Sequence, residues 1–457
     1  MSSFATLDSE VELLRRSLGD IFPVDDAKVL APKLVQELLR RHRKAGGGMP
    51  RAVWDAQHRS VVVFLYPVGG RQPYAACAVE LEAPGAREMR SDLTFVRRFA
   101  HLFNEDLARC PTVDADAAWH ALTDTRFARA IAEMSPFDSR LALGWIQAMK
   151  RSMSLTYEGR AVHHCVLFAH DSASTLKRIG RYVARLDAPL AVEAALLEEK
   201  WVRAVVDGDR VILLGDAHGQ IVGLISFSSM ARDGVRGTEP LYGPHTSLTP
   251  LQHMMRKNDM ALIVSPYGDL YVLLWNGVTF KQSQGRWTYQ NYLRVHQTLS
   301  GFLGEDVVLS VLRAALDLSF ERKGALLFLR DAERVRFPEW DPIEDSDDGG
   351  KANRILRDAL RGMKITKWAD RQVITAAAST DGATVLDMRG RVVDIACMIK
   401  PAPAQVLSEH GFGRAPSSDG ARSSAAWHAS FFGIAIKVSD DGPISIWRDG
   451  VRLTHLD

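Results

Sequence analysis

Two segments in the last quarter of the chain carry residue types that could bind a metal ion and a phosphate group. The first is Asp381-Gly382-Ala383, which lies where an expected helix gives way to an expected strand. A carboxylate there can hold Mg²⁺ or Mn²⁺ against a phosphate, and glycine lets a nucleotide approach the backbone closely. Asp-Gly also occurs in ordinary turns, so a turn aspartate without a ligand is the alternative interpretation.

The second segment, Gly420-Ala421-Arg422-Ser423-Ser424, comes directly before another expected helix. Free amide groups and the dipole at a helix start favour anions, and an arginine there pairs well with phosphate oxygens. Ser423 and Ser424 can donate hydrogen bonds to phosphate, although they supply no charge. The alternative interpretation is a serine-capped helix that binds nothing.

Two further segments complete a pattern. Residues 323–329 are expected to form a buried strand directly after an amphipathic helix, and Ser439-Asp440-Asp441 precedes Gly442-Pro443 in a sequence typical of a hairpin turn. In order and spacing, the four segments resemble the diadenylate cyclase domain, the nucleotidyltransferase module of the DNA-integrity scanning protein and its relatives. The resemblance covers roughly residues 303–457, about a third of the chain.

The resemblance implies a reaction and a role for each residue. It implies that two ATP molecules are joined into cyclic di-AMP, with Asp381 binding the catalytic Mg²⁺ or Mn²⁺ and activating the ribose 3′-hydroxyl. It places the nucleotide against Gly382, Ala383 and the five residues 420–424. The segment Ser439-Asp440-Asp441 is the third site segment. In relatives, an acidic residue at this place helps to position the metal, which points to Asp441, with Asp440 close behind.

The chain departs from the family pattern at one place. Relatives carry Gly-Thr/Ala-Arg-His-Arg, and Ser423 and Ser424 stand here for the histidine and the second arginine. Loss of a cation from a triphosphate clamp weakens transition-state stabilisation more than it weakens nucleotide binding. Two hypotheses therefore stay open: a soluble cyclase that makes cyclic di-AMP or a related cyclic dinucleotide, and a catalytically degenerate sensor that binds ATP or a cyclic nucleotide.

The family chemistry also implies an assembly. Two cyclase domains must meet face to face, each with one ATP, so activity implies a homo-oligomer. The first 300 residues would then sense a signal and control that pairing.

The elements expected along the chain indicate three domains. An α+β domain spans residues 1–155, a β-rich sensor-like domain spans 156–302, and the nucleotide-binding domain spans 303–457. The middle domain combines expected helices at 172–184 and 191–206 with two expected hairpins, 211–227 and 260–275. In the last domain, strands alternate with helices and a long loop reaches Gly420, which predicts an α/β fold with a mixed sheet flanked by helices.

Composition excludes several function classes. The 457 residues are 46% apolar and 25% charged, with a net charge of +2, which gives no argument for binding nucleic acid or an anionic membrane. No apolar run reaches the length of a membrane-spanning helix, and the first residues lack a signal-peptide pattern. Four scattered cysteines, Cys77, Cys110, Cys165 and Cys397, are typical of reduced thiols in a cytoplasmic protein.

Overall fold

The computed structural model describes most of the chain. The described residues are 14, 17–18, 27–44, 50, 52–55, 60–66, 75–80, 88–109, 115–208, 210–226, 243–334, 341–344, 355, 357–416 and 420–456. The sequence also predicts a first helix at 8–18, a helix end at the glycines 46–48 and an exposed acidic loop at 339–348. Most of the first helix, the three glycines, most of the acidic loop and Cys110 lie outside the described residues. The chain divides into two compact units, Met1–Arg236 with Pro250–Gln290, and Gly237–Thr249 with Asn291–Asp457.

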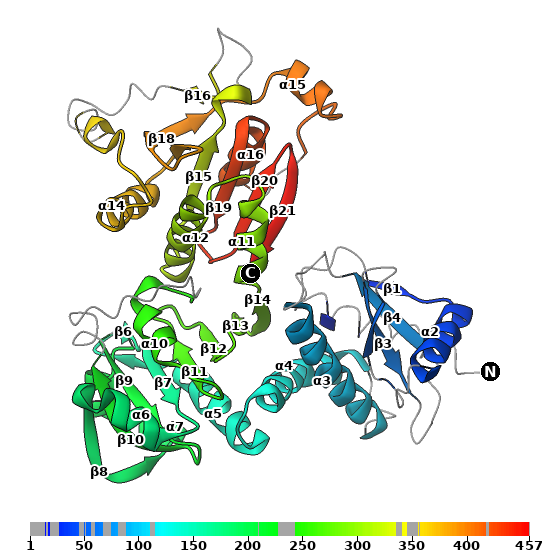
Figure 1. The fold of residues 1–457 in the computed structure, drawn as a ribbon, viewed down its shortest axis with the longest axis vertical. Helices are drawn as coiled ribbons and strands as arrows, with labels where there is room; N and C mark the ends of the chain where they lie inside the picture. The colour runs from blue at the N-terminus through cyan, green and yellow to red at the C-terminus, as the bar shows by residue number, and fades with distance from the viewer. Residues whose placement is uncertain are drawn as a thin grey trace. The chain divides into compact units, whose positions relative to one another are not determined.

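The first unit contains a four-stranded antiparallel sheet in the order β1-β4-β3-β2 (Figure 1). Its strands are β1 Ala27–Val29, β2 Ala52–Asp55, β3 Ser60–Leu65 and β4 Ala75–Glu80. The helix α2, Pro32–Lys44, packs its buried Val35 and Leu38 with alternate residues of β3 such as Val62 and Phe64. The sequence predicts strands at 60–66 and 74–81, and the two central strands β3 and β4 lie inside these ranges.

The first unit also contains an eight-stranded mixed sheet in the order β14-β13-β12-β11-β7-β9-β10-β8. Among the described strand pairs of this sheet, only β7 and β9 are parallel. The strands are β7 His164–Phe168, β8 Val183–Ala191, β9 Val211–Gly215, β10 Gln220–Ser226, β11 Met260–Val264, β12 Leu270–Leu274, β13 Thr279–Ser283 and β14 Arg286–Gln290. Both predicted hairpins are confirmed, because β9 pairs with β10 and β11 pairs with β12.

Several helices of the first unit, α3, α4, α5, α7 and α8, share one large apolar core with this sheet. The long helices are α3 Glu88–Arg109, α4 Ala115–Met134 and α5 Ser139–Ser152, and the shorter ones are α6 Ser172–Ile179, α7 Ala194–Glu198, α8 Lys200–Val205 and α10 Thr249–Met254. The α5 side chain of Trp145 stacks on Phe168 of β7, with ring centroids 4.0 Å apart. A small two-stranded sheet, β5 Thr156–Tyr157 with β6 Arg160–Ala161, follows α5.

The predicted helices at 172–184 and 191–206 are wrong in their extents. The first ends at Ile179, and Val183–Ala191 is instead the edge strand β8, which pairs with β10. An edge position tolerates Pro189, since its missing amide need not join the ladder. The second segment forms two short helices, α7 and α8, separated by Glu199 in an extended conformation. Strand pairing therefore outweighs the helical pattern of the local sequence.

The second unit is a seven-stranded mixed sheet in the order β16-β18-β17-β15-β19-β20-β21 (Figure 1). Its strands are β15 Ala325–Arg330, β16 Ile343–Glu344, β17 Ala383–Asp387, β18 Val392–Ile399, β19 Gly433–Val438, β20 Ile444–Arg448 and β21 Val451–Leu456. Its helices are α11 Tyr292–Ser300, α12 Glu305–Phe320, α14 Trp368–Ala378, α15 Ala404–Glu409 and α16 Ala421–Ala429. The α/β class with a mixed sheet flanked by helices agrees with the prediction.

Alternating residues of the central strands bury both faces of this sheet. In β15, Leu327 and Leu329 join the core that contains α11, α12 and α14, whereas Leu326 and Phe328 join a second core with α16. The period of two along a strand sends neighbouring side chains to opposite faces, so each strand supplies both cores. Helix α16 thus lies across the face opposite to α12.

Two features of the second unit were not predicted. The expected long loop before Gly420 contains the short helix α15, and the sheet continues beyond β20 with β21. The sequence also predicts a helix at 305–320 and a strand at 392–399, and both are confirmed residue for residue by α12 and β18. Among the described residues, no helix is both long and apolar enough to cross a membrane.

Candidate functional site

A cavity of about 990 Å³ opens in the second unit where the predicted site segments meet. Its lining includes every residue that the sequence analysis assigns to the site. The full lining is Leu326, Asp381, Gly382, Ala383, Cys397, Met398, Ile399, Pro401, Gly420, Ala421, Arg422, Ser423, Ser424, Ala425, His428, Lys437, Ser439, Asp440 and Asp441. Segments that lie up to 115 residues apart in the sequence, from Leu326 to Asp441, are therefore neighbours in one hollow.

The first segment bridges α14, which ends at Ala378, and β17, which begins at Ala383. Gly382 adopts a φ of +95°, and a Cβ atom there would lie 2.6 Å from the backbone carbonyl carbon of Ala396 on β18. Only glycine fits such a close approach of two backbones. The side chain of Asp381 is fully exposed at this turn, so its carboxylate is available to a ligand in the cavity.

The second segment forms the start of α16. Gly420, with a φ of +118°, is the residue before the helix, and among the described residues no side chain caps the helix start. Ser423 and Ser424 lie inside the first turn, so the capping role that the alternative interpretation gave to a serine of this segment is wrong. The first amide groups of a helix have no partner within the helix, so they face the ligand space when no cap covers them.

Arg422 lies between two of the acidic segments. Its Nη1 donates hydrogen bonds to both carboxylate oxygens of Asp440, each at 2.9 Å, and its Nη2 lies 3.8 Å from Oδ1 of Asp381. The Asp440 side chain is 71% exposed, so water screens much of this attraction. The arrangement holds the guanidinium group in the lining of the cavity.

The third segment is the hairpin turn between β19 and β20. The amide of Gly442 donates to the carbonyl of Ser439 at 3.0 Å, and the amide of Ser439 donates to the carbonyl of Pro443 at 2.8 Å. The turn interpretation is thus correct, and the turn also lines the cavity. The sequence favours Asp441 over Asp440 as the acidic residue of this segment. In the structure it is Asp440 that forms an ion pair with another site segment, through Arg422.

Two polar residues of the lining were missed by the sequence analysis. Lys437, on β19, donates a hydrogen bond to Oγ of Ser423 at 2.8 Å. His428 lies one turn beyond Ser424 on α16. Both had a signal in the sequence: a lysine interrupts the apolar strand 433–438, and a histidine follows Ser424 at the helical spacing of four.

The protonation of His428 is fixed by its surroundings. The backbone amide of Ala402 donates to Nδ1 at 3.1 Å, which makes that nitrogen an acceptor. Burial lowers the pKa of His428 below its ordinary value, so the ring is neutral near pH 7 and carries its proton on Nε2. His428 is therefore a neutral residue of the lining whose remaining proton is on Nε2.

Cys397, the one cysteine of the lining, is a poor nucleophile. Burial, with the nearby charge of Asp394, raises the pKa of its thiol to about 12. The reactive form of cysteine is the thiolate, which is scarce under these conditions. The thiol of Cys397 is therefore no candidate for a nucleophile near neutral pH.

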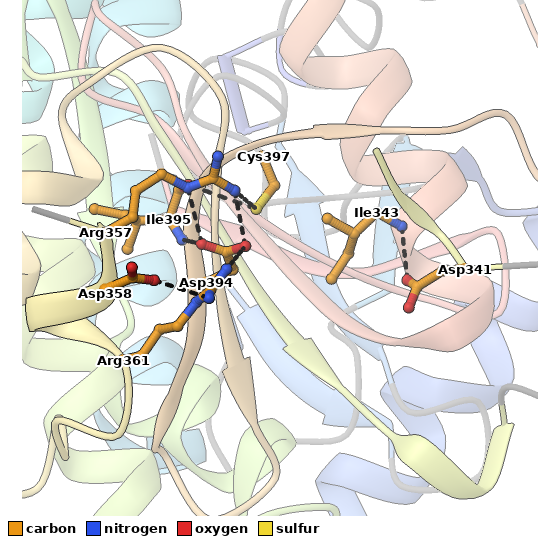
Figure 2. A network of polar contacts seen from close by, with 8 residues as sticks. All are labelled: Asp341, Ile343, Arg357, Asp358, Arg361, Asp394, Ile395 and Cys397. Atoms are coloured by element: carbon orange, nitrogen blue, oxygen red, sulfur yellow. Dashed lines mark hydrogen bonds and ion pairs between the residues drawn. The ribbon is translucent and has the colours of Figure 1, made fainter. Parts of the chain in front are cut away.

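A buried ion-pair network supports the β18 wall of the cavity (Figure 2). Arg357 donates to both oxygens of Asp394, Nε at 3.0 Å and Nη2 at 2.7 Å, and Nη2 of Arg361 adds a third contact at 3.0 Å. Burial alone would raise the pKa of Asp394, but these hydrogen bonds and the amide of Ile395 hold it below its ordinary value. The network fixes the irregular stretch of β18 that ends at Cys397.

The carboxylates of the cavity fit a metal ion only together with a ligand. Among the described residues, no group of three or more histidine, cysteine and acidic side chains is placed to hold a metal ion. Asp381 and Asp440 both contact Arg422, so two carboxylates from different segments come close together. Mg²⁺ commonly takes one or two protein carboxylates and completes its shell with phosphate oxygens and water. Asp381 and Asp440 are two carboxylates of the type that Mg²⁺ takes in such sites.

Comparison with known proteins gives no relative from which to transfer a function. No known family, no curated protein and no solved structure matches this chain. The interpretation of the site therefore depends on its own residues.

We predict that Arg357→Met destabilises the second unit by about 3 kcal/mol, because it leaves the buried carboxylate of Asp394 without its main partner. The matched variant Arg361→Met removes a guanidinium that is 48% exposed and should cost less than about 1 kcal/mol. Urea unfolding measures both.

Because the pKa of Asp394 is lowered on folding, the contribution of the network to stability is present above about pH 4 and is lost below it. The difference in unfolding free energy between Arg357→Met and the parent should therefore shrink as the pH falls below about 4. Equal losses of stability in Arg357→Met and Arg361→Met would contradict this prediction.

Proposed function

We propose that the second unit is a diadenylate cyclase-like nucleotidyltransferase domain that binds ATP in the cavity and joins two ATP molecules into a cyclic dinucleotide. The observation that carries the proposal is that Asp381, the start of α16 and the hairpin turn at Asp440 line one hollow. The mixed sheet with α16 on one face and α12 on the other supports it, since it positions these segments at neighbouring strand and helix ends.

In the proposed reaction, each nucleotide would have its phosphates at the first turn of α16 and its ribose near Asp381. The carboxylate of Asp381 would accept the proton of the ribose 3′-hydroxyl, whose oxygen attacks the α-phosphate of a second ATP and expels pyrophosphate. Two such steps close the ring. The second ATP would be held by a second copy of the domain, so we propose that the active form is a homo-oligomer.

The charges of the lining support a requirement for Mg²⁺ or Mn²⁺. The lining carries three carboxylates, Asp381, Asp440 and Asp441, against two cations, Arg422 and Lys437. A triphosphate would therefore enter a hollow with an excess of negative charge, which disfavours binding unless divalent cations accompany it. When bound, the ion would neutralise charge on the phosphates, and Asp381 with Asp440 or Asp441 would hold it.

A second candidate is an ATP or cyclic-nucleotide sensor without catalysis. The observation that favours it is the two-fold contact of Asp440 with Arg422, which engages the only arginine of the α16 segment. Ser423 and Ser424 add no charge in its place. In this candidate, the ligand is held and reported to the rest of the chain, and a reaction product is absent.

The first prediction of the proposal concerns turnover. Purified full-length protein with ATP and Mn²⁺ should form a cyclic dinucleotide that mass spectrometry detects, and a chelator should abolish its formation. Asp381→Asn should reduce the rate at least about a hundredfold, because it removes the carboxylate that accepts the proton. Asp187→Asn, an exposed carboxylate in β8, is the control. Full turnover in Asp381→Asn would exclude this site, and ATP binding without any product would favour the sensor.

The second prediction concerns the arginine. Arg422→Ala should weaken ATP binding about tenfold and flatten its dependence on salt, since a charge-assisted contact to phosphate is lost while Asp440 stays in the mouth of the cavity. Arg414→Ala, an exposed arginine outside the lining, should bind ATP like the parent. Isothermal titration at two salt concentrations measures both. Unchanged affinity in Arg422→Ala would exclude phosphate binding at the start of α16.

A further inference from the structure

Lys437 occupies a position where a strand normally carries an apolar residue. Along β19, the side chains of Ile434, Ile436 and Val438 are buried in the core with α12. The period of two sends Lys437 to the other face, toward α16, where it is half-buried and lines the cavity. A lysine is rarely placed on a covered face of a sheet unless its ammonium group has a partner.

The partner within the protein is neutral. Nζ of Lys437 donates to Oγ of Ser423 at 2.8 Å, and Ser423 is the third residue after Gly420, inside the first turn of α16. In the described part of the chain, Lys437 forms no ion pair within 4 Å, whereas the charge of Arg422 is balanced by Asp440. An ammonium group beside a helix start also faces the positive end of the helix dipole, which is unfavourable until an anion arrives.

We infer that Lys437 is a phosphate-binding residue, which supplies from β19 the cation that the Arg422-Ser423-Ser424 segment lacks. The inference rests on the proposed nucleotide site and assigns one further contact to it. An ammonium group has three protons, of which Ser423 accepts one, so others are left for phosphate oxygens. Ser423 then positions the lysine as well as the helix start, and the serine replacement does not remove the positive charge from the clamp.

The competing explanation is that Lys437 only braces α16 against the sheet. Both explanations predict some loss of stability on mutation, so stability cannot separate them. They differ in charge dependence. If Lys437 only braces α16, its mutation affects all compounds that bind in the cavity alike. If Lys437 binds phosphate, its mutation weakens the binding of compounds that carry phosphates and leaves the binding of others unchanged.

The test compares Lys437→Met and Lys437→Arg in the full chain by titration with ATP, inorganic pyrophosphate and adenosine, each with Mn²⁺. Lys437→Met should bind ATP and pyrophosphate at least about tenfold more weakly, with adenosine unchanged, because a charge-assisted hydrogen bond is lost. Lys437→Arg should restore most of the affinity for both phosphates. Lys367→Met, an exposed lysine at the start of α14, is the control and should bind like the parent.

Three outcomes would overturn the inference. If Lys437→Met binds ATP and pyrophosphate like the parent, Lys437 is no phosphate ligand, and the nucleotide site survives without it. If adenosine binding falls as much as ATP binding, the residue acts through the shape of the cavity. If the parent itself binds neither ATP nor pyrophosphate, the proposed nucleotide site is wrong, and the phosphate-binding role of Lys437 is wrong with it.

Discussion

The ion pair between Arg422 and Asp440 joins the start of α16 to the hairpin turn after β19, and it depends on the absence of a side chain at residue 324. A Cβ atom on Gly324 would lie 1.8 Å from Oδ1 of Asp440 and 2.3 Å from Nη1 of Arg422. Any other residue would displace the ends of these two side chains, so the ion pair would have to rearrange. With glycine, both side chains reach the backbone just before β15, and the first segment lies beside the same guanidinium, with Oδ1 of Asp381 3.8 Å from Nη2.

Two glycines leave room for the segments that line the cavity. Gly382 lets β17 approach Ala396 of β18, and Gly324 leaves room for the ion pair. The buried network of Arg357 and Asp394 then holds β18 in its irregular conformation. Such features place polar groups of different segments around one hollow, while the rest of the sheet remains a regular apolar core.

Local patterns in the sequence predict the elements of the second unit well and the contacts between them poorly. The helix α12 and the strand β18 were predicted residue for residue, because apolar periodicity and turn residues mark their ends. The edge strand β8 and the helix α15 were missed, since pairing and packing with distant residues decide them. Lys437 was missed for a related reason: its importance comes from Ser423 on another element, and a single sequence does not record that pair.

The central claim is that the hollow between α16, the turn at Asp381 and the hairpin at Asp440 holds a nucleotide by its phosphates. The most direct measurement is a crystal structure of the full chain grown with Mn²⁺ and a non-hydrolysable ATP analogue. The account predicts phosphate density against the first turn of α16, within hydrogen-bond distance of Arg422 and Lys437. Density for the analogue at another place in the chain, with this hollow empty, would contradict it.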